Sequence, residues 1–172
     1  MAGRRQAPQL EIHVSPDTPA PPRLEFRVDD PARPELRPLI EPTDGYLAEL
    51  HPTGNIEPVS LAALQRPQVT LLTARVDGDP VACGACIDEG DYVEIKRMYV
   101  LPACRGLGLG KQLLEAMEAH VRGRGGRMVK LEAGTAQAEA LELYERAGYR
   151  RCPPFGEHHA NPRSVCMEKV LA

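Results

Sequence analysis

The chain has 172 residues, with 21 lysines and arginines against 24 aspartates and glutamates, and a formal net charge of −3. This length suits one domain with a single core, and the charge excludes a general attraction to nucleic acid or to an anionic membrane. No run of 18 apolar residues occurs, and no apolar segment follows the early arginines, so we predict neither a membrane span nor an export signal. The five cysteines are odd in number and scattered, which favours a reducing cytoplasm over a disulfide-linked secreted scaffold.

The N-terminal segment differs in composition from the rest of the chain. Residues 1–22 are rich in proline and lack a sustained apolar period, which is typical of a flexible extension. We expect the folded domain to span residues 23–172 and to begin with a short strand at Leu24. Between Pro34 and Leu50, apolar residues recur at helical spacing but are interrupted by Pro42 and Gly45, which predicts two short helices. Residues 61–64 predict one further helical turn.

Three strand-like runs follow, separated by turns. Residues 69–76 and 81–87 flank the turn at residues 77–80, and this arrangement predicts a hairpin. Residues 92–101 are rich in β-branched and aromatic side chains and are followed by Pro102, which stops a strand. The pattern therefore predicts three consecutive antiparallel strands.

The next segment predicts an amphipathic helix. Apolar side chains between Leu109 and Val121 form one stripe opposite a charged face, and glycines from Gly123 to Gly126 end it. Residues 128–131 read as a strand.

The C-terminal part predicts a second helix and the last strands. Thr135 can cap this helix and Gly148 can stop it. Residues 149–152 and 164–170 are the remaining strand candidates.

The segment Arg105-Gly-Leu-Gly-Leu-Gly-Lys111 lies between the third strand and the amphipathic helix. A strand, a glycine-rich turn and a helix N-terminus form an anion site, because free N–H groups and the positive end of the helix dipole converge there. The P-loop spacing fails, since Arg105 stands at its first glycine and Gln112 at its hydroxyl position. The dinucleotide fingerprint also fails, because Lys111 or Leu113 would occupy its last glycine position. The alternative is a glycine turn that only lets the helix pack close to the sheet.

Arg105, Gly108 and Gly110 match the pattern Arg-x-x-Gly-x-Gly, and here the sequence resembles the GNAT superfamily of coenzyme A-dependent N-acyltransferases. The resemblance extends in element order from about Leu24 to the C-terminus and includes Tyr-x-x-x-Gly-Tyr, which starts at Tyr144. It implies an α+β fold with α/β layers: a mixed, mostly antiparallel central sheet of about six to seven strands, flanked by helices. It also implies acetyl-CoA as co-substrate, with its pyrophosphate on the loop residues Arg105, Gly106, Leu107, Gly108, Leu109, Gly110 and Lys111.

The resemblance assigns further residues to the coenzyme. Met98, Tyr99 and Val100 would lie along the pantetheine arm, with the Met98 N–H near the thioester oxygen, where a backbone donor suits the developing negative charge. Gln137 stands where the family usually has an asparagine that contacts the pantetheine, and its side chain is longer.

Two residues are candidates for proton transfer. Glu94 lies four residues before Met98, where several family members carry a general base, and an amine that is protonated at neutral pH needs one. Alternatively, Glu94 pairs with Lys96 or Arg97. Tyr144 matches the tyrosine that can protonate the departing thiol, and its alternative role is that of a core aromatic residue on an amphipathic helix.

Two other motifs could suggest a metal. Cys83 and Cys86 have a spacing that places their sulfurs on opposite faces of a strand, so we interpret them as buried small residues. His158 and His159 have no acidic or cysteine partner at ligand spacing, so we interpret them as part of a surface loop. We predict no metal site.

The sequence therefore predicts a cytoplasmic enzyme that transfers an acetyl group from acetyl-CoA to a primary amine by direct attack in a ternary complex. The acceptor would be a small-molecule or peptide amine, with no nucleic-acid or membrane partner, and a homodimer is possible by resemblance. The alternative is a non-catalytic coenzyme A-binding regulatory domain, whereas a nucleotide-triphosphate switch is disfavoured by Gln112. The acceptor itself has no recognisable sequence code.

Overall fold

The computed structural model of the protein describes residues 19–50 and 61–172. The flexible extension predicted for residues 1–22 lies almost wholly outside these ranges. The first element, β1 (Leu24–Asp29), begins where the sequence predicts the first strand.

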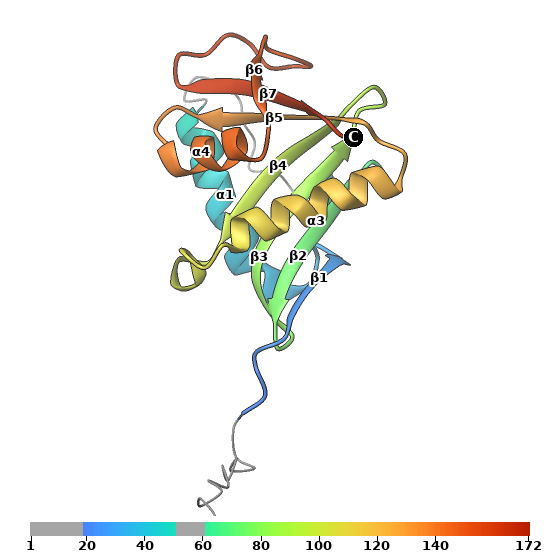
Figure 1. The fold of residues 1–172 in the computed structure, drawn as a ribbon, viewed down its shortest axis with the longest axis vertical. Coiled ribbons are helices and arrows are strands. Elements are labelled where there is room, and N and C mark those ends of the chain that lie inside the picture. Colours follow the sequence, from blue (N-terminus) through green and yellow to red (C-terminus); the bar gives the residue numbers. More distant parts are fainter. Residues whose placement is uncertain (1–18, 51–60) are drawn as a thin grey trace, which may run out of the picture.

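Within the described residues, seven strands form one sheet in the order β1-β2-β3-β4-β5-β7-β6 (Figure 1). Besides β1, they are β2 (Val69–Val76), β3 (Asp79–Asp88), β4 (Val93–Val100), β5 (Met128–Gly134), β6 (Arg150–Cys152) and β7 (Ser164–Val170). All neighbouring strands are antiparallel except β4 and β5, which are parallel. The predicted sheet and its three consecutive antiparallel strands are confirmed.

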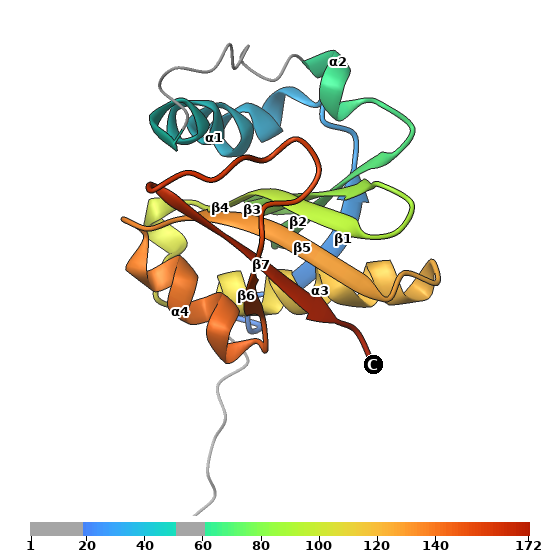
Figure 2. The ribbon, with the colours of Figure 1, turned by 90° about the horizontal axis from the view of Figure 1, so that it is seen from above.

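Helices cover both faces of this sheet, as Figure 2 shows. The helices α1 (Arg37–Leu50) and α2 (Leu61–Leu64) lie on one face, and α3 (Leu109–Gly123) and α4 (Ala138–Arg146) lie on the other. Short 3-10 turns, η1 (Pro34–Leu36) and η2 (Pro102–Cys104), precede α1 and the glycine loop. A large apolar core, including Leu113, Leu114 and Met117 of α3, fills one side, and a smaller core around Leu36 and Leu39 fills the other.

The prediction of two short helices between Pro34 and Leu50 is wrong, because α1 continues through Pro42. Proline removes one helical hydrogen bond and usually kinks or ends a helix. Here tertiary contacts hold the helix on both sides of it: Leu39 is 1 % exposed in the core, and Thr43 accepts a hydrogen bond from the buried Arg97 at 2.8 Å. Pro42 itself is exposed, so its ring meets solvent.

The start of α4 also differs from the prediction. Thr135 is not its N-cap: the helix begins at Ala138 with Gln137 before it, and no side chain of the described residues caps this end. The Thr135 N–H instead donates to the Arg163 carbonyl at 2.8 Å. The loop after β5 is therefore fixed to the chain that leads into β7, and it delays the helix by a few residues.

The cysteine prediction is confirmed. Cys83 packs in the core on the α1 side and Cys86 in the core on the α3 side. All five cysteines are free thiols. Burial raises the pKa of both the Cys83 and the Cys86 thiol to about 12.

β4 is irregular at the point where it passes the helices. Its register against β3 shifts so that Arg97 and Met98 both lie opposite Gly84, which is a β-bulge. Arg97 adopts a φ of +58°, a conformation that costs a non-glycine residue about 1–2 kcal/mol. Its buried guanidinium donates to Thr43 and pairs with Asp44 at 2.7 Å, and these bonds to α1 offset that cost.

Gly84 lets Met98 pass close to the opposite strand. A Cβ at this position would lie 2.6 Å from the Met117 sulfur and 3.2 Å from Met98 Cγ. A residue with a side chain would fit there only if the end of the Met117 side chain moved, so the glycine of β3 favours the bulge in β4.

β4 and β5 pair over only a short distance. The paired residues are Val93 with Val129 and Glu94 with Lys130. Beyond them the two strands diverge toward the end of β4 that leads to the glycine loop (Figure 1).

Candidate active site

The glycine loop ends in an open helix N-terminus. Gly106 and Gly108 have φ values of +80° and +77°, which other residues rarely adopt. Gly108 is the N-cap of α3, and no side chain in the described part of the chain caps it. The first N–H groups of α3 therefore remain available for an anion.

The two basic residues of this loop differ in their contacts. Arg105 Nε donates to the Val100 carbonyl at 3.0 Å, and its guanidinium lies 5.3 Å from the centre of the Tyr99 ring. Arg105 thus fixes the loop to the end of β4. The Lys111 ammonium lies 3.9 Å from Glu115 in an exposed pair, so it is only weakly held.

The structure brings Met98 and Tyr144 together where β4 and β5 diverge. Tyr144 extends from α4, and its hydroxyl donates to the Met98 sulfur at 3.6 Å. Its ring packs edge-on against Tyr149 at 5.8 Å. Tyr144 is therefore part of the packing and is also directed at the bulge of β4. Both interpretations from the sequence, a proton donor to the thiol and a core aromatic residue, remain compatible with this position.

The other residues expected near the coenzyme lie around the same region. Met98 and Val100 pack against the α3-side core, and Tyr99 packs against the α1-side core. Gln137 is exposed at the start of α4, where its N–H donates to the Gly134 carbonyl at 3.0 Å.

Glu94 lies on the opposite face of β4 from Tyr144. Its neighbour Ile95 belongs to the α3-side core, so alternation along the strand directs Glu94 to the α1 side. The residue is 5 % exposed. Lys96 lies 3.6 Å away, as one sequence interpretation predicts, whereas Arg97 pairs with Asp44 instead.

The closest partner of Glu94 is a residue that the sequence did not associate with it. His158 Nε2 lies 2.6 Å from Glu94 Oε1, and His158 Nδ1 lies 2.9 Å from Glu132 Oε2 on β5. The interpretation of His158 as a surface-loop residue is therefore wrong, although its neighbour His159 is exposed. We call Glu94, His158 and Glu132 the carboxylate–histidine cluster.

The loop between β6 and β7 is built to hold this imidazole. Phe155 is buried and packs against the Tyr92 ring at 5.4 Å and against the His158 ring at 4.7 Å. The His158 N–H donates to the Phe155 carbonyl at 2.9 Å, which closes a turn. Gly156 has a positive φ, and a Cβ there would lie 2.8 Å from the Tyr92 hydroxyl.

The cluster favours a protonated imidazole. Hydrogen bonds to Glu132 and to Glu94 raise the pKa of His158 to about 9, although burial acts in the opposite direction. Both ring nitrogens then carry a proton, and each faces one carboxylate.

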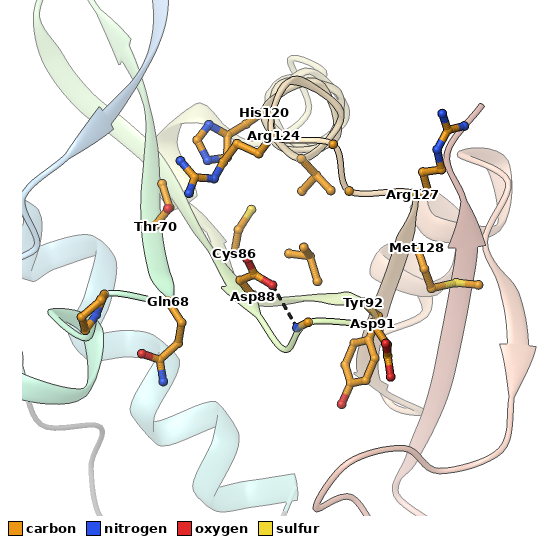
Figure 3. Close-up of a pocket in the computed structure, with 16 residues that line it drawn as sticks. Gln68, Thr70, Cys86, Asp88, Asp91, Tyr92, His120, Arg124, Arg127 and Met128 are labelled. Carbon is orange, nitrogen blue, oxygen red and sulfur yellow. Dashed lines mark hydrogen bonds between the residues drawn. The ribbon is translucent and has the colours of Figure 1, made fainter.

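Two hollows lie away from this cluster. A groove of about 550 Å³ separates α3 from α4 and is lined by Lys111, Glu139 and Arg146 among others. A pocket of about 450 Å³ lies at the C-terminal end of α3, where His120, Arg124, Asp88 and Tyr92 line it (Figure 3).

The pocket in Figure 3 lies far from the glycine loop, although Val93, the neighbour of Glu94, is among the residues that line it. The 15 residues of α3 separate it from the glycine loop, a length of about 22 Å. Its lining includes neither Tyr144 nor any member of the carboxylate–histidine cluster. The candidate active site is therefore the region where β4 and β5 diverge, with Met98 and Tyr144 in contact there and the glycine loop after β4.

No group of histidine, cysteine, aspartate and glutamate side chains in ranges 19–50 and 61–172 is arranged to hold a metal ion. In the same ranges, no helix has both the length and the apolar character to cross a membrane.

Comparisons with known proteins agree with this geometry. Residues 34–149 match the model of the acetyltransferase (GNAT) family. The chain is 38% identical over 152 residues to "IAA acetyltransferase" of Azospirillum brasilense, a match that covers 87% of this chain and 99% of the relative.

Solved structures show the same fold. A Klebsiella pneumoniae protein assigned as an acyl-CoA N-acyltransferase superposes with a TM-score of 0.73 at 33% identity, over 87% of this chain and 98% of the other. An aminoglycoside 6'-N-acetyltransferase complexed with coenzyme A superposes with a TM-score of 0.64 at 16% identity, over 85% and 96%. From the family match and the relatives above 30% identity, the chain belongs to the GNAT family of acetyltransferases.

Proposed function

We propose that this protein transfers an acetyl group from acetyl-CoA to a primary amine, by direct attack in a ternary complex. Acetyl-CoA is the acetyl donor of GNAT acetyltransferases. The observation that carries the proposal is the placement of Tyr144 and Glu94 on opposite faces of β4, beside the region where β4 and β5 diverge. An acid on the donor side and a base on the acceptor side are what acyl transfer to an ammonium requires.

The donor side fits coenzyme A. The open N-terminus of α3 offers N–H groups and a positive dipole end to a pyrophosphate, and Gly106 and Gly108 let the ligand approach the backbone. The Arg105 guanidinium already contacts the Val100 carbonyl and the Tyr99 ring. In this proposal the backbone N–H groups are therefore the main hydrogen-bond donors to the pyrophosphate, and Arg105 shapes the loop. Met98, at the bulge, would direct its N–H toward the thioester oxygen.

The acid and the base have separate tasks. Glu94 would accept a proton from the acceptor ammonium, and the neutral nitrogen would attack the carbonyl carbon. Tyr144 would donate a proton to the departing sulfur. A thiol with a pKa of about 8.5 is a fair leaving group, so this second step helps less than the first.

The acceptor side is formed by the α1 face of β4 and β5 and by the loop that carries His158 (Figure 2). The similarity to a protein named "IAA acetyltransferase" makes IAA a compound to include in the acceptor panel. The five free thiols support the cytoplasm as the compartment. A homodimer stays a prediction.

A thiol-release screen tests the proposal. Acetyl-CoA is incubated with the wild-type protein and a panel of amino acids, polyamines, aminoglycosides, peptides and IAA. We expect coenzyme A release that depends on an amine. Binding of coenzyme A without turnover on any amine would contradict the proposal and favour the non-catalytic alternative.

Two variants then test the assigned residues. With the best amine, Glu94→Gln is expected to lower kcat by about 10²–10⁴-fold, the usual size of a general-base effect, and Tyr144→Phe by less. Glu89→Gln is the matched control, because Glu89 is an exposed glutamate in the turn before β4. Full activity of the Glu94→Gln, Tyr144→Phe double variant would remove both assignments.

A further inference from the structure

Glu94 is not an isolated carboxylate, and its surroundings suggest a role for two residues outside the usual sequence motifs. The contacts of 2.6 Å and 2.9 Å place the His158 imidazole between two carboxylates on neighbouring strands. His158 is only 14% exposed, and Glu132 and Glu94 are 6% and 7% exposed at their side chains. The three groups are therefore largely shielded from solvent.

We infer that Glu94, His158 and Glu132 act as one proton-holding unit, in which the proton leaving the acceptor amine enters at Glu94 and is held on His158. This inference rests on the proposed function. Glu94 is the only member of the unit that would touch the acceptor, and His158 and Glu132 are positioning residues that act through it.

The proton count supports a shared proton. With both ring nitrogens protonated, the imidazolium has a carboxylate oxygen 2.6 Å from Nε2 and another 2.9 Å from Nδ1, and both contacts are favourable. If one proton leaves the unit, a nitrogen lone pair faces a carboxylate oxygen at about the same distance, which is repulsive. The unit that has lost this proton is thus a strong base, and a proton from the acceptor restores the favourable contacts.

Strength matters because the acceptor is a weak acid. A lysine-type ammonium has a pKa of about 10.4, roughly six pH units above that of an ordinary glutamate. The two carboxylates raise the pKa of His158 to about 9. This value lies within about two pH units of the pKa of the ammonium. Proton transfer from the ammonium to the unit is therefore far less unfavourable than transfer to a lone carboxylate.

The step starts from the form of the unit in which His158 Nε2 carries no proton, the form that becomes common as the pH rises toward 9. The acceptor ammonium loses one proton to Glu94, which passes it to His158 Nε2. The nitrogen lone pair forms the new C–N bond at the thioester carbonyl, the C–S bond breaks, and the electron pair of that bond leaves with sulfur. Sulfur takes a proton from Tyr144, which regains one as the nitrogen loses its second proton. Later the unit releases its proton to solvent.

Other charged and titratable groups face the unit. On β4, Lys96 lies 3.6 Å from Glu94 and adds a positive charge on the exposed side. On β5, Lys130 pairs with Glu168 of β7 at 3.0 Å, so its charge is matched. On β7, burial and then the charge of the nearby Glu132 raise the pKa of Cys166 to about 11, so this thiol stays neutral in the range considered.

The test combines an NMR titration with kinetics. Histidine-labelled wild-type protein is titrated without substrate, and the His158 signal is assigned with His158→Gln. We expect both ring nitrogens to stay protonated until about pH 9, and Glu132→Gln to move this midpoint down by at least one pH unit. A wild-type midpoint near 6.5 would overturn the inference whatever the activity.

The kinetic arm compares kcat/KM of wild type and His158→Gln from pH 7 to pH 9.5, with the amine that turns over best. Because the same amine is used, its own ionisation cancels in the ratio of the two values. The ratio is expected to rise at least tenfold between pH 7 and pH 9. A purely structural role would give a ratio that does not change with pH, and that result would overturn the inference.

His159→Gln is the matched control, because His159 is the exposed neighbour of His158, and its ratio to wild type should stay near one. The two proposals fail differently. No turnover on any amine contradicts the proposed function, and the inference falls with it. Turnover with a flat ratio contradicts the inference alone.

Discussion

Glu94 and Glu118 are both buried glutamates, but they lie on opposite faces of the sheet and have different partners. Glu118, on α3, accepts hydrogen bonds from Lys169 Nζ at 2.8 and 3.0 Å and from the Tyr149 hydroxyl at 3.0 Å. Glu94, on β4, shares a hydrogen bond with His158 at 2.6 Å. Both residues are about equally buried, at 4% and 5% exposure.

The difference between the two sites lies in the chemistry of the partner. A lysine ammonium and a phenol both ordinarily keep their protons up to about pH 10, so the contacts of Glu118 do not change over the physiological range. Burial, and then the charge of Glu118, raises the pKa of Tyr149 further. The pKa of His158 is about 9, below the ordinary values of a lysine and a phenol, so its proton leaves first as the pH rises. Burial alone therefore does not indicate function; a partner that can titrate does.

The largest expected effect tests the Glu118 site as a structural one. Glu118→Ala leaves Lys169 and Tyr149 without their acceptor, and loss of one member of a buried ion pair costs about 4 kcal/mol. The free energy of unfolding, measured by urea denaturation, should fall by this amount while the folded protein keeps its kcat. Glu115→Ala, on the exposed face of the same helix, should change it by less than about 0.5 kcal/mol. A comparable small change in Glu118→Ala would remove the contrast between the two sites.

The second prediction uses pH to separate the sites. The pKa of His158 is raised in the folded protein from 6.5 to about 9, so its contribution to stability is fully present below pH 6.5 and is lost as the pH rises through 9. A difference of this size corresponds to about 3 kcal/mol. Wild type should therefore lose this stability relative to His158→Gln between pH 6 and pH 9.5. His159→Gln should follow wild type, and parallel curves for wild type and His158→Gln would contradict the assignment.

The smallest expected effect tests how the Glu118 site is assembled. Tyr149→Phe removes one hydrogen bond to a charged acceptor, which is worth about 2 kcal/mol. Because both single variants remove this same hydrogen bond, the double variant Tyr149→Phe, Glu118→Ala should be less destabilised than the sum of the single variants. Strict additivity in urea denaturation would show that the tyrosine and the glutamate are not coupled.

Sequence patterns were sufficient where the signal is local. The stripe from Leu109 to Val121 predicted α3, and the loop from Arg105 to Lys111 was placed correctly before it, because a helix face and a glycine turn are each defined within a few residues. The same local reasoning failed at Pro42, where contacts from Arg97 and from the core hold a helix that the local sequence would interrupt.

The carboxylate–histidine cluster could not be predicted in this way. His158 and Glu94 are 64 positions apart in the chain, and nothing beside His158 indicates which strand it will reach. A partial signal existed: Glu94 pairs with Lys130, so Glu132, two residues further along β5, must lie on the same face as Glu94. The pairing of β4 with β5 would have suggested two adjacent carboxylates, but only the fold supplies the imidazole between them.

The buried cysteines have a practical consequence for experiments on this protein. Thiol reagents react with the thiolate, and a pKa of about 12 leaves roughly one thiol in 10⁴ ionised at pH 8. Cys83 and Cys86 therefore stay silent toward such reagents in the native chain and become reactive once the sheet opens. The rate at which these two thiols are modified therefore reports the rate of unfolding. The thiol of coenzyme A released by turnover can be distinguished from these buried thiols, because free coenzyme A reacts at once.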